Sequence, residues 1–261
     1  MKTSPIVSVV TPVYNAANFL EETIQSVLNQ TYPHWELILI DDCSSDGSFE
    51  IAKAYSTDDF RIKCFQLSEN QGAGIARNFG IKEAKGTFIA FLDADDLWFP
   101  EKLQKQVDFM INNNCNICFS SYQLMNEDGT LQSKIVEALD LLSYNKLLKS
   151  NYIGNLTGIY NTETLGKIYA PVIRKRQDWA LWLTALKIEK EALGIKEPLA
   201  YYRVRKNSIS ENKMGLLKYN YAVYNKVLGF STLKSLFLMG MFLWEHFFVK
   251  SKQIKPISEI N

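Results

Sequence analysis

The amino-acid sequence predicts an α/β protein with a mainly parallel, Rossmann-like sheet flanked by helices. Two observations lead to this prediction. In the first half of the chain, short apolar segments alternate with longer amphipathic ones, and this alternation is typical of right-handed βαβ units. After Cys118 the alternation stops. We therefore expect a smaller mixed region to follow, with helices at the end of the chain.

The first half contains four apolar segments that we expect to be strands, at Ile6–Thr11, Trp35–Ile40, Ile62–Leu67 and Thr87–Leu92. Helices are predicted to follow them, at Ala16–Gln30, from a cap at Ser45 or Asp46 to about Tyr55, at Gly74–Ala84, and over about 100–112. We expect Gly86 to close the third helix and Pro100 to lie in the first turn of the fourth. The next strand should enter the core near Cys118.

The second half is predicted to be irregular. Asn126-Glu127-Asp128-Gly129 is typical of a hairpin turn. The remaining elements that we expect are a short helix near Ser143–Ser150, a strand at Gly154–Tyr160, a helix over about 179–190, and a strand at Leu199–Val204.

The end of the chain contains an apolar, aromatic-rich segment at residues 236–249. Its 14 residues include Glu245 and His246, so it is too short to be read as a membrane span. Lysines flank it, at positions 226, 234, 250, 252 and 255. Two interpretations stay open: a helix that lies at a membrane surface through residues 231–255, or a helix that docks on the protein's own core or on a partner.

Composition narrows the function classes. The chain has 261 residues, a net charge of +1 and a hydrophobic content of 47%, so it can bury a full core and has no overall charge that favours nucleic acid. The N-terminus does not resemble a signal peptide, which predicts a cytoplasmic protein. The four cysteines lack the spacing of a zinc site, and we expect them to be reduced and buried.

Carboxylates follow two of the predicted strands. Asp41-Asp42 ends the second strand, and Asp93-Ala94-Asp95-Asp96 ends the fourth. The carboxyl ends of parallel strands lie at one edge of a sheet, where α/β proteins bind ligands, so these side chains should share a site. Carboxylate oxygens suit Mg²⁺ or Mn²⁺, which usually also take phosphate oxygens from a substrate. The pattern therefore predicts a site for a metal and a diphosphate.

Four motifs in this order resemble a known family. They are Ser8-Val9-Val10-Thr11-Pro12-Val13-Tyr14-Asn15, Leu39-Ile40-Asp41-Asp42-Cys43-Ser44-Ser45-Asp46-Gly47-Ser48, Gly72-Ala73-Gly74-Ile75-Ala76-Arg77-Asn78-Phe79-Gly80, and Phe91-Leu92-Asp93-Ala94-Asp95-Asp96. The chain is similar to family 2 glycosyltransferases, which are inverting enzymes of the GT-A fold, and especially to bacterial members that build cell-surface polysaccharides. The resemblance covers residues 5–125 strongly, 126–210 weakly, and nothing beyond.

The resemblance implies roles for the donor-binding residues. Thr11, Pro12, Tyr14 and Asp42 would line the base and ribose of the nucleotide. Asp93-Ala94-Asp95 matches the DXD motif of the family, in which Asp95 would bind the metal and Asp93 the ribose or the metal. Arg77 stands where the family often has a basic residue near these acids.

The resemblance also implies a catalytic base. Asp178 matches the usual position of that carboxylate, although Gln177 replaces the acid that commonly precedes it. The segment Tyr202–Ser210 resembles a loop that closes over the donor, with Arg203 or Arg205 facing the diphosphate. In these terms we divide the chain into a nucleotide-sugar-binding half (1–125), an acceptor and catalytic-base half (126–210), and a helical extension (211–261).

The implied activity is metal-dependent transfer, with inversion, of a sugar from a nucleotide diphosphate. A UDP-sugar is the expected donor, and a saccharide or lipid-linked saccharide the expected acceptor, at the inner face of the cytoplasmic membrane. Two other functions remain open. Gly72-Ala73-Gly74 distantly resembles the fingerprint of a nicotinamide oxidoreductase, although it follows the third strand and not the first. A non-catalytic scaffold that binds nucleotide sugars is the other.

Two residues have plainer interpretations. Arg77 can be a surface residue of its helix that pairs with Glu83 or another acid. Asp178 can be the N-cap of the helix that follows it. Either interpretation would remove a residue from the site.

Overall fold

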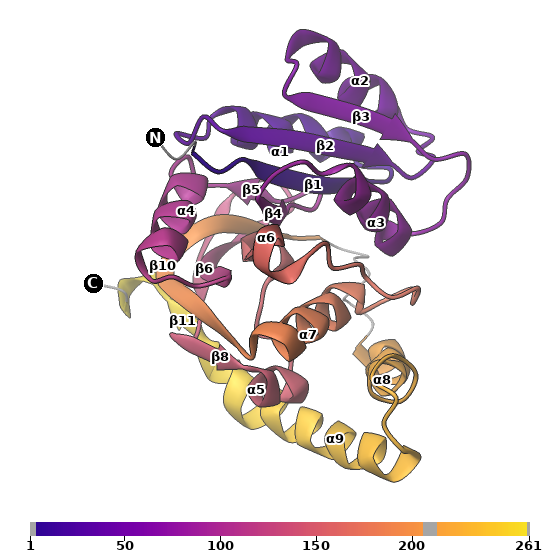
Figure 1. Cartoon of the computed structure of the whole chain (residues 1–261), viewed down its shortest axis with the longest axis vertical. Helices are drawn as coiled ribbons and strands as arrows, with labels where there is room; N and C mark the ends of the chain where they lie inside the picture. Colours follow the sequence, from indigo (N-terminus) through magenta and orange to yellow (C-terminus); the bar gives the residue numbers. More distant parts are fainter. Residues whose placement is uncertain (1–3, 206–212, 260–261) are drawn as a thin grey trace.

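The computed structural model describes residues 4–205 and 213–259. Within this part of the chain, eleven strands form one sheet in the order β11-β7-β6-β9-β4-β1-β2-β3, and β10 pairs with β5, β6 and β8 beside this path. Helices flank the sheet, and the C-terminal helices lie at the end of the molecule farthest from α2 and β3 (Figure 1). The predicted α/β fold class is confirmed.

The first half follows the predicted alternation. Its strands are β1 (Val7–Val13), β2 (Trp35–Asp41), β3 (Ile62–Gln66) and β4 (Phe88–Phe91). Its helices are α1 (Ala17–Leu28), α2 (Ser48–Asp58), α3 (Ala73–Glu83) and α4 (Lys102–Asn112). The four strands pair in parallel, in the order β3-β2-β1-β4, so their carboxyl ends share one edge.

The core lies on both faces of this sheet. Along β1, Val9 packs into one apolar cluster and Val10 into the other, because successive side chains of a strand point to opposite faces. Leu20, Ile24 and Val27 form the predicted buried face of α1. Burial on both faces explains why the strands are continuously apolar.

The second half is mixed. Its strands are β5 (Leu97–Trp98), β6 (Ile117–Asn126), β7 (Leu131–Val136), β8 (Leu141–Ser143), β9 (Ile159–Asn161) and β10 (Glu191–Val204). Its helices are α5 (Tyr144–Lys149), α6 (Thr162–Leu165) and α7 (Gln177–Glu189). The strand predicted at Gly154–Tyr160 is correct only at its end, where β9 begins at Ile159, because Asn155–Thr157 forms a 3-10 turn, η1. The hairpin turn between β6 and β7 is present, with Gly129 at φ +87°.

Two expected helix ends differ from the prediction. The N-cap of α2 is Gly47, while the Asp46 carboxylate accepts a hydrogen bond from the Ala17 amide at 3.0 Å and so ties the starts of α1 and α2 together. Helix α3 ends at Glu83 with Ala84 as its C-cap, and it is not closed by Gly86. A Cβ at Gly86 would lie 2.6 Å from the Ile6 carbonyl oxygen, so this glycine permits close approach to β1. Cys43 is exposed, contrary to expectation, and all four cysteines are free.

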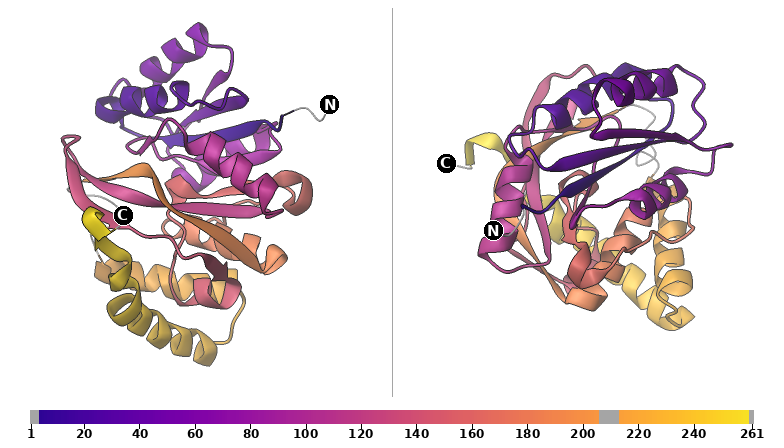
Figure 2. Two further views of the ribbon diagram at one scale, coloured as in Figure 1. Left: turned by 90° about the vertical axis from the view of Figure 1, so that its left-hand side faces the viewer. Right: turned by 45° about the horizontal axis from the view of Figure 1, so that its top comes forward.

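The C-terminal segment wraps around the second half (Figure 2). It consists of α8 (Lys213–Ala222), a π turn at Val223–Val227, α9 (Thr232–Trp244), a π turn η3 (Glu245–Val249), a 3-10 turn η4 (Lys250–Gln253), the short strand β11 (Ile254–Pro256) and a 3-10 turn at Ile257–Glu259. β11 was not predicted, and it extends the sheet beside β7.

Helix α9 has two different faces. Leu238 and Phe242 are buried, and the Phe242 ring lies 5.5 Å from the Trp179 ring of α7. The opposite face exposes Leu233, Phe237 and Trp244. Of the two predicted interpretations, the structure therefore bears out the one in which the helix docks on the protein's own core. No helix in the described residues has the length and apolarity that a membrane crossing requires.

Candidate active site

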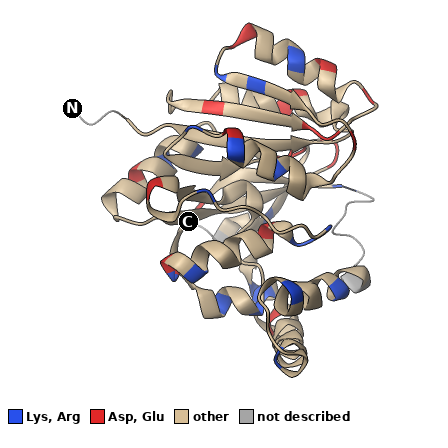
Figure 3. Cartoon of the chain, turned by 45° about the vertical axis from the view of Figure 1, so that its right-hand side comes forward, with Lys and Arg blue, Asp and Glu red and all other residues tan. Residues whose placement is uncertain are grey.

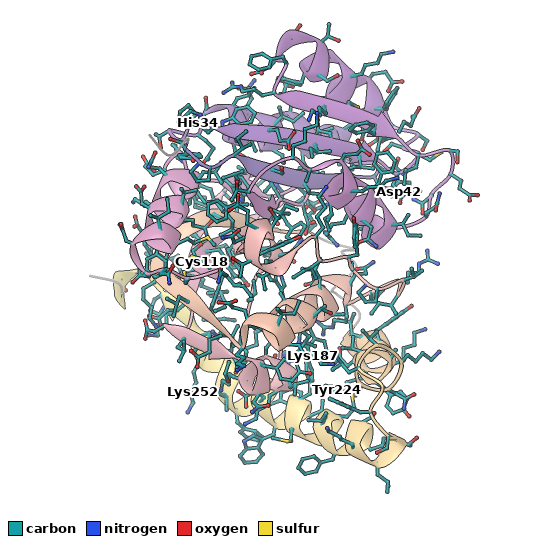
Figure 4. The ribbon with its side chains drawn as sticks, in the orientation of Figure 1. His34, Asp42, Cys118, Lys187, Tyr224 and Lys252 are labelled. Carbon is teal, nitrogen blue, oxygen red and sulfur yellow. The ribbon has the colours of Figure 1, made fainter. Side chains whose placement is uncertain are left out.

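The predicted site lies at the carboxyl edge of the parallel strands. Thr11 is in β1, Asp42 follows β2, and Asp93 follows β4. Figure 4 shows Asp42 at this edge, close to α3. The strand order reverses between β1 and β4, because β2 and β3 lie on one side of β1 and β4 on the other. A crevice for ligands is expected at such a point.

Three carboxylates crowd the end of β4. Burial raises the pKa of Asp96 well above its usual value, and the neighbouring charges of Asp95 and Asp93 raise it further. Asp96 connects the end of β4 with β10, since its Oδ1 accepts a hydrogen bond from the Arg203 amide at 2.8 Å. Burial, together with the charge of Asp95, also raises the pKa of Asp93, against the opposing charge of Arg77. Such a cluster favours a bound cation.

Arg77 belongs to this site. Its side chain is only 4% exposed, and Nη2 donates to Asp93 Oδ1 at 3.0 Å. The interpretation of Arg77 as a surface residue is therefore wrong. In the part of the chain that the structure describes, its buried Nε and Nη1 have no hydrogen-bond partner. A buried guanidinium with unpaired donors is arranged to bind oxyanions.

The two arginines of the predicted donor loop are placed differently. The Arg203 guanidinium is held by protein oxygens: Nε donates to the Asp95 carbonyl at 2.8 Å, and Nη2 pairs with Glu22 at 2.5 Å. Arg205 pairs through Nη1 with Asp95 Oδ2 at 2.9 Å, and its buried Nε has no hydrogen-bond partner among the described residues. Arg205 is thus the arginine with a donor to spare. Residues 206–210 of the predicted loop lie outside the described residues.

Asp178 lies in the first turn of α7 and faces the acidic cluster. The N-cap of this helix is Arg176, at φ 68°, so the interpretation of Asp178 as the N-cap is wrong. Asp178 Oδ2 accepts a hydrogen bond from Asn151 Nδ2 at 2.9 Å. Its charge is among those that raise the pKa of Asp93, after burial and Asp95. The structure thus brings residues from β4 and α7 to one place.

Sequence reasoning missed two asparagines. Asn151 contacts Asp178, and Asn155 in η1 donates to Asp93 Oδ1 at 3.4 Å. Each stands in a short polar segment with no motif around it. The signal that could have found them is their position between two predicted elements of the second half, which is weak.

The residues predicted to bind the nucleotide line the β1 and β2 ends. Pro12 is buried and Tyr14 is exposed. Asp42 fixes the chain before α3, because its two oxygens accept hydrogen bonds from the amides of Gln71 at 2.8 Å and Gly72 at 2.7 Å. A cavity of about 270 Å³ opens beside this loop, lined by residues of segments 70–75 and 171–177.

Unpaired polar atoms collect at the same edge. In the described part of the chain, ten buried side-chain nitrogen or oxygen atoms have no hydrogen-bond partner, and six of them belong to Thr11, Asp41, Arg77, Asn155 and Arg205. Buried polar groups are almost always paired, so unpaired ones in one place indicate a missing ligand. Both acceptors and donors are present, as a nucleotide diphosphate requires.

The donor set suits a hard divalent ion. Asp95 and Asp93 offer carboxylate oxygens, the preferred ligands of Mg²⁺ and Mn²⁺. Among the residues that the structure describes, no three or more His, Cys, Asp or Glu side chains are grouped to hold a metal ion. Mg²⁺ in proteins usually keeps several waters and takes phosphate oxygens from a substrate beside one or two carboxylates.

Several known proteins are similar to this chain in sequence. The profile described as glycosyl transferase family 2 matches residues 8–170. A putative teichuronic acid biosynthesis glycosyltransferase of Bacillus subtilis, TuaG, is 46% identical over 85% of this chain and 88% of its own length. The Escherichia coli enzyme WfgD, named a UDP-Glc:alpha-D-GlcNAc-diphosphoundecaprenol beta-1,3-glucosyltransferase, is 39% identical over 82% of this chain and 83% of its own.

Solved structures share the fold. Residues 1–349 of S. aureus TarS, in complex with UDP-GlcNAc, superpose with a TM-score of 0.74 at 22% identity, over 93% of this chain and 72% of that one. The mannosyltransferase PcManGT of Pyrobaculum calidifontis, with GDP-Man and Mn²⁺, gives a TM-score of 0.69 at 15% identity, over 97% and 72%. The predicted GT-A fold is confirmed.

These likenesses decide between the functions that the sequence left open. The nicotinamide alternative is wrong, since Gly72 and Gly74 begin α3, where the Gly72 amide holds Asp42. The relatives are named glycosyltransferases, so the predicted enzyme class is confirmed. The chain belongs to glycosyl transferase family 2.

Proposed function

We propose that this protein transfers a sugar from a UDP-sugar to a lipid-linked saccharide, with a divalent metal and with inversion, during cell-surface polysaccharide synthesis. The observation that carries the proposal is the convergence of Asp95, Arg77 and Asp178 on Asp93, whose pKa all three charges influence. The donor and acceptor classes are taken from the names of the relatives.

The diphosphate leaving group would be bound by Arg77, by Arg205 and by a divalent metal that Asp95 holds. Asp95, with Asp93 as a further ligand or ribose contact, would hold Mn²⁺ or Mg²⁺. When bound, the ion offsets the charge that develops on the departing diphosphate. Arg77, which pairs with Asp93, would contribute its positive charge beside the diphosphate. Arg205 is free to do so once it leaves Asp95.

Asp178 is the proposed general base. Its Oδ2 is held by Asn151, and Oδ1 is left to accept the proton of the acceptor hydroxyl. The deprotonating hydroxyl attacks the anomeric carbon on the side opposite the diphosphate, so the configuration inverts. A positioned base of this kind contributes about 10²–10⁴-fold to the rate.

The nucleotide would lie over the ends of β1 and β2. Thr11 carries a buried, unpaired Oγ1, and Pro12 and Tyr14 follow it on the same loop. Asp42 can accept from the base while it holds the Gln71 and Gly72 amides, because each carboxylate oxygen has two lone pairs. Residues 1–125 would thus bind the nucleotide sugar, residues 126–210 the acceptor, and residues 211–261 would form an extension.

The exposed face of α9 and η3 is the proposed membrane contact. It presents Phe237, Trp244 and Phe247, and a cavity of about 570 Å³ lies between this face and Lys149. Residues 211–261 contain seven lysines and three glutamates, a net of +4, and Figure 3 shows Lys and Arg on these helices. Aromatic side chains with flanking lysines suit an anionic lipid interface, where a lipid-linked acceptor resides.

Vesicle sedimentation tests this contact. Trp244 and Phe247 are 63% and 64% exposed, and the control Phe60, in the first half, is 91% exposed. We expect the double variant Trp244→Glu, Phe247→Glu to lose binding to vesicles that contain anionic phospholipid, while Phe60→Glu binds like the wild type. Equal binding by both variants would remove the membrane from the proposal.

A thermal-shift screen tests the donor. UDP-glucose, UDP-GlcNAc, GDP-mannose and NADH would be compared with and without Mn²⁺. A ligand at 100 times its dissociation constant stabilises the folded state by about 2.7 kcal/mol. We expect a UDP-sugar to raise the melting temperature only when Mn²⁺ is present, and Asp95→Ala to abolish the rise. A rise that is independent of Mn²⁺, or one that survives in Asp95→Ala, would contradict the metal site.

A further inference from the structure

Asn151 connects Asp178 with the C-terminal segment. It lies between α5 and η1, and its Nδ2 donates to Asp178 Oδ2 at 2.9 Å. Its Oδ1 accepts from the Ile153 amide at 3.3 Å. The second hydrogen bond fixes which end of the side-chain amide faces Asp178, because the oxygen is already used by the backbone.

Two residues that follow α9 contact the segment around Asn151. Lys250 in η4 donates through Nζ to the Asn151 carbonyl oxygen. Glu245 in η3 is buried, accepts from the Tyr152 hydroxyl at 2.5 Å, and pairs with Lys146. Burial raises the pKa of Glu245, but the hydrogen bonds from Lys146 and Tyr152 outweigh it and the pKa is lowered. The ionised carboxylate is thus the form that holds Tyr152.

Lys250 also lies within the electrostatic reach of the proposed base. Burial and the nearby charge of Arg176 lower its pKa to about 8, and the charge of Asp178 opposes them. The Tyr152 ring also lies near Lys250, with its centre 5.7 Å from Nζ. Lys250 is therefore mainly protonated at neutral pH and can hold the Asn151 carbonyl with a charged donor.

We propose that Asn151 is a positioning residue for Asp178 and that Lys250, from the C-terminal segment, keeps Asn151 in place. The inference rests on the proposed role of Asp178 as the base. Its consequence is that residues beyond 8–170, the range that the family profile matches, take part in orienting the base. A base acts only when its free oxygen points at the acceptor hydroxyl, and a displacement of about 1 Å can lower the rate on the order of 100-fold.

Matched variants test the proposal. Asn151→Leu removes the amide, Lys250→Met removes the cation, and Lys250→Arg keeps it. Lys187→Met is the control, because Lys187 is an exposed lysine in the last turn of α7, the helix that carries Asp178 (Figure 4). Urea denaturation would verify that each variant is folded, and calorimetry with UDP and Mn²⁺ would measure the donor site.

The activity assay is UDP release from UDP-glucose with a short-chain lipid diphosphate of GlcNAc as acceptor. We expect kcat to fall on the order of 10–100-fold in Asn151→Leu and Lys250→Met, with UDP affinity and the KM for UDP-glucose unchanged. Lys250→Arg should recover most of the loss, and Lys187→Met should match the wild type. A general loss of structure would instead lower UDP affinity in every damaged variant.

Hydrogen exchange provides a readout that needs no substrate. The amide of Ile153 is protected by Asn151 Oδ1, so exchange in the peptide that contains residues 151–153 reports on this loop. We expect faster exchange in Lys250→Met and wild-type exchange in Lys187→Met. Unchanged exchange in Lys250→Met would overturn the proposal even if no acceptor is turned over.

Asp178→Asn, assayed beside these variants, separates the two claims. If Asp178→Asn loses activity while Asn151→Leu and Lys250→Met keep the wild-type kcat, this inference fails and the base assignment stands. If Asp178→Asn itself keeps the wild-type kcat, Asp178 is not the base and the proposed function loses its catalytic residue.

Discussion

Lys102 is a buried cation whose replacement should change how the stability of the protein depends on pH. Its side chain has no exposed surface. Nζ donates to Gln106 Oε1 at 2.5 Å and lies 3.8 Å from the centre of the Trp98 ring, which is itself buried in the core. Burial lowers the pKa of Lys102 to about 7, with a small opposing influence from Cys118.

The magnitude follows from that pKa. In the unfolded chain Lys102 has its ordinary pKa of 10.5. Between pH 7 and pH 10.5 the unfolded state therefore binds a proton that the folded state does not. The free energy of unfolding should then rise with pH, by about 1.4 kcal/mol per unit at most and by roughly 5 kcal/mol over the whole interval. Between pH 7 and pH 9 the rise amounts to about 2 kcal/mol.

Urea denaturation at pH 7 and pH 9 measures this. Lys102→Met removes the titrating group but leaves Gln106 Oε1 unpaired, which costs about 1–3 kcal/mol at every pH. The diagnostic quantity is therefore the change with pH: the wild type should gain about 2 kcal/mol relative to Lys102→Met. The partly exposed Lys105, one turn away in sequence, provides the control Lys105→Met. Parallel pH dependence in the wild type and Lys102→Met would refute the reasoning.

Two further predictions concern the metal site and the packing of the core. Arg205→Gln frees Asp95 from its ion pair, so Mn²⁺ alone should bind more tightly, as electron paramagnetic resonance would show. UDP binding in the presence of Mn²⁺ should weaken. Tighter binding of both Mn²⁺ and UDP would contradict the role of Arg205. A Cβ at Gly158 would lie 2.2 Å from the Trp182 ring, so Gly158→Ala should lower the free energy of unfolding by about 1–3 kcal/mol. Gly240 in α9 has open space where a Cβ would lie, so Gly240→Ala should leave the free energy of unfolding unchanged or raise it by up to about 1 kcal/mol. Equal unfolding midpoints for the two alanine variants would argue against this packing.

The parallel half of the fold could be predicted because its signals are local. Each strand there is a short apolar run, and two of these runs, β2 and β4, lead into carboxylates. Helices α1 and α4 each show an apolar face. The topology then places the ends of β1, β2 and β4 together without further information. For this reason the sequence also led to Asp42, Asp93 and Asp95 as neighbours at one edge.

The second half depends on contacts between distant residues. The segment at 154–160 is apolar enough for a strand, but the buried Asn155 and Thr157 belong to a 3-10 turn that local periodicity does not distinguish. Arg77 is a further case, since only the fold shows that it is buried beside Asp93. The link from Lys250 to Asn151 spans 99 residues of sequence, so no pattern could have revealed it.

The end of the chain was ambiguous for a physical reason. Helix α9 is apolar on both faces, and one face packs on Trp179 while the other is exposed. Hydrophobic periodicity identifies the buried face of a helix when the opposite face is polar. When both faces are apolar, it does not show which of them is buried. The docked face is now identified, and the exposed face carries the proposed lipid contact.

The rate of sugar transfer by Asp178→Asn tests the central claim most directly. The substitution keeps the size of the side chain and removes its ability to accept a proton, so the donor site should be unaffected. At saturating UDP-glucose, Mn²⁺ and acceptor, we expect the rate to fall by about 10²–10⁴-fold, with UDP affinity unchanged. A rate within twofold of the wild type would contradict the account, and so would a loss of activity that came from lost UDP binding.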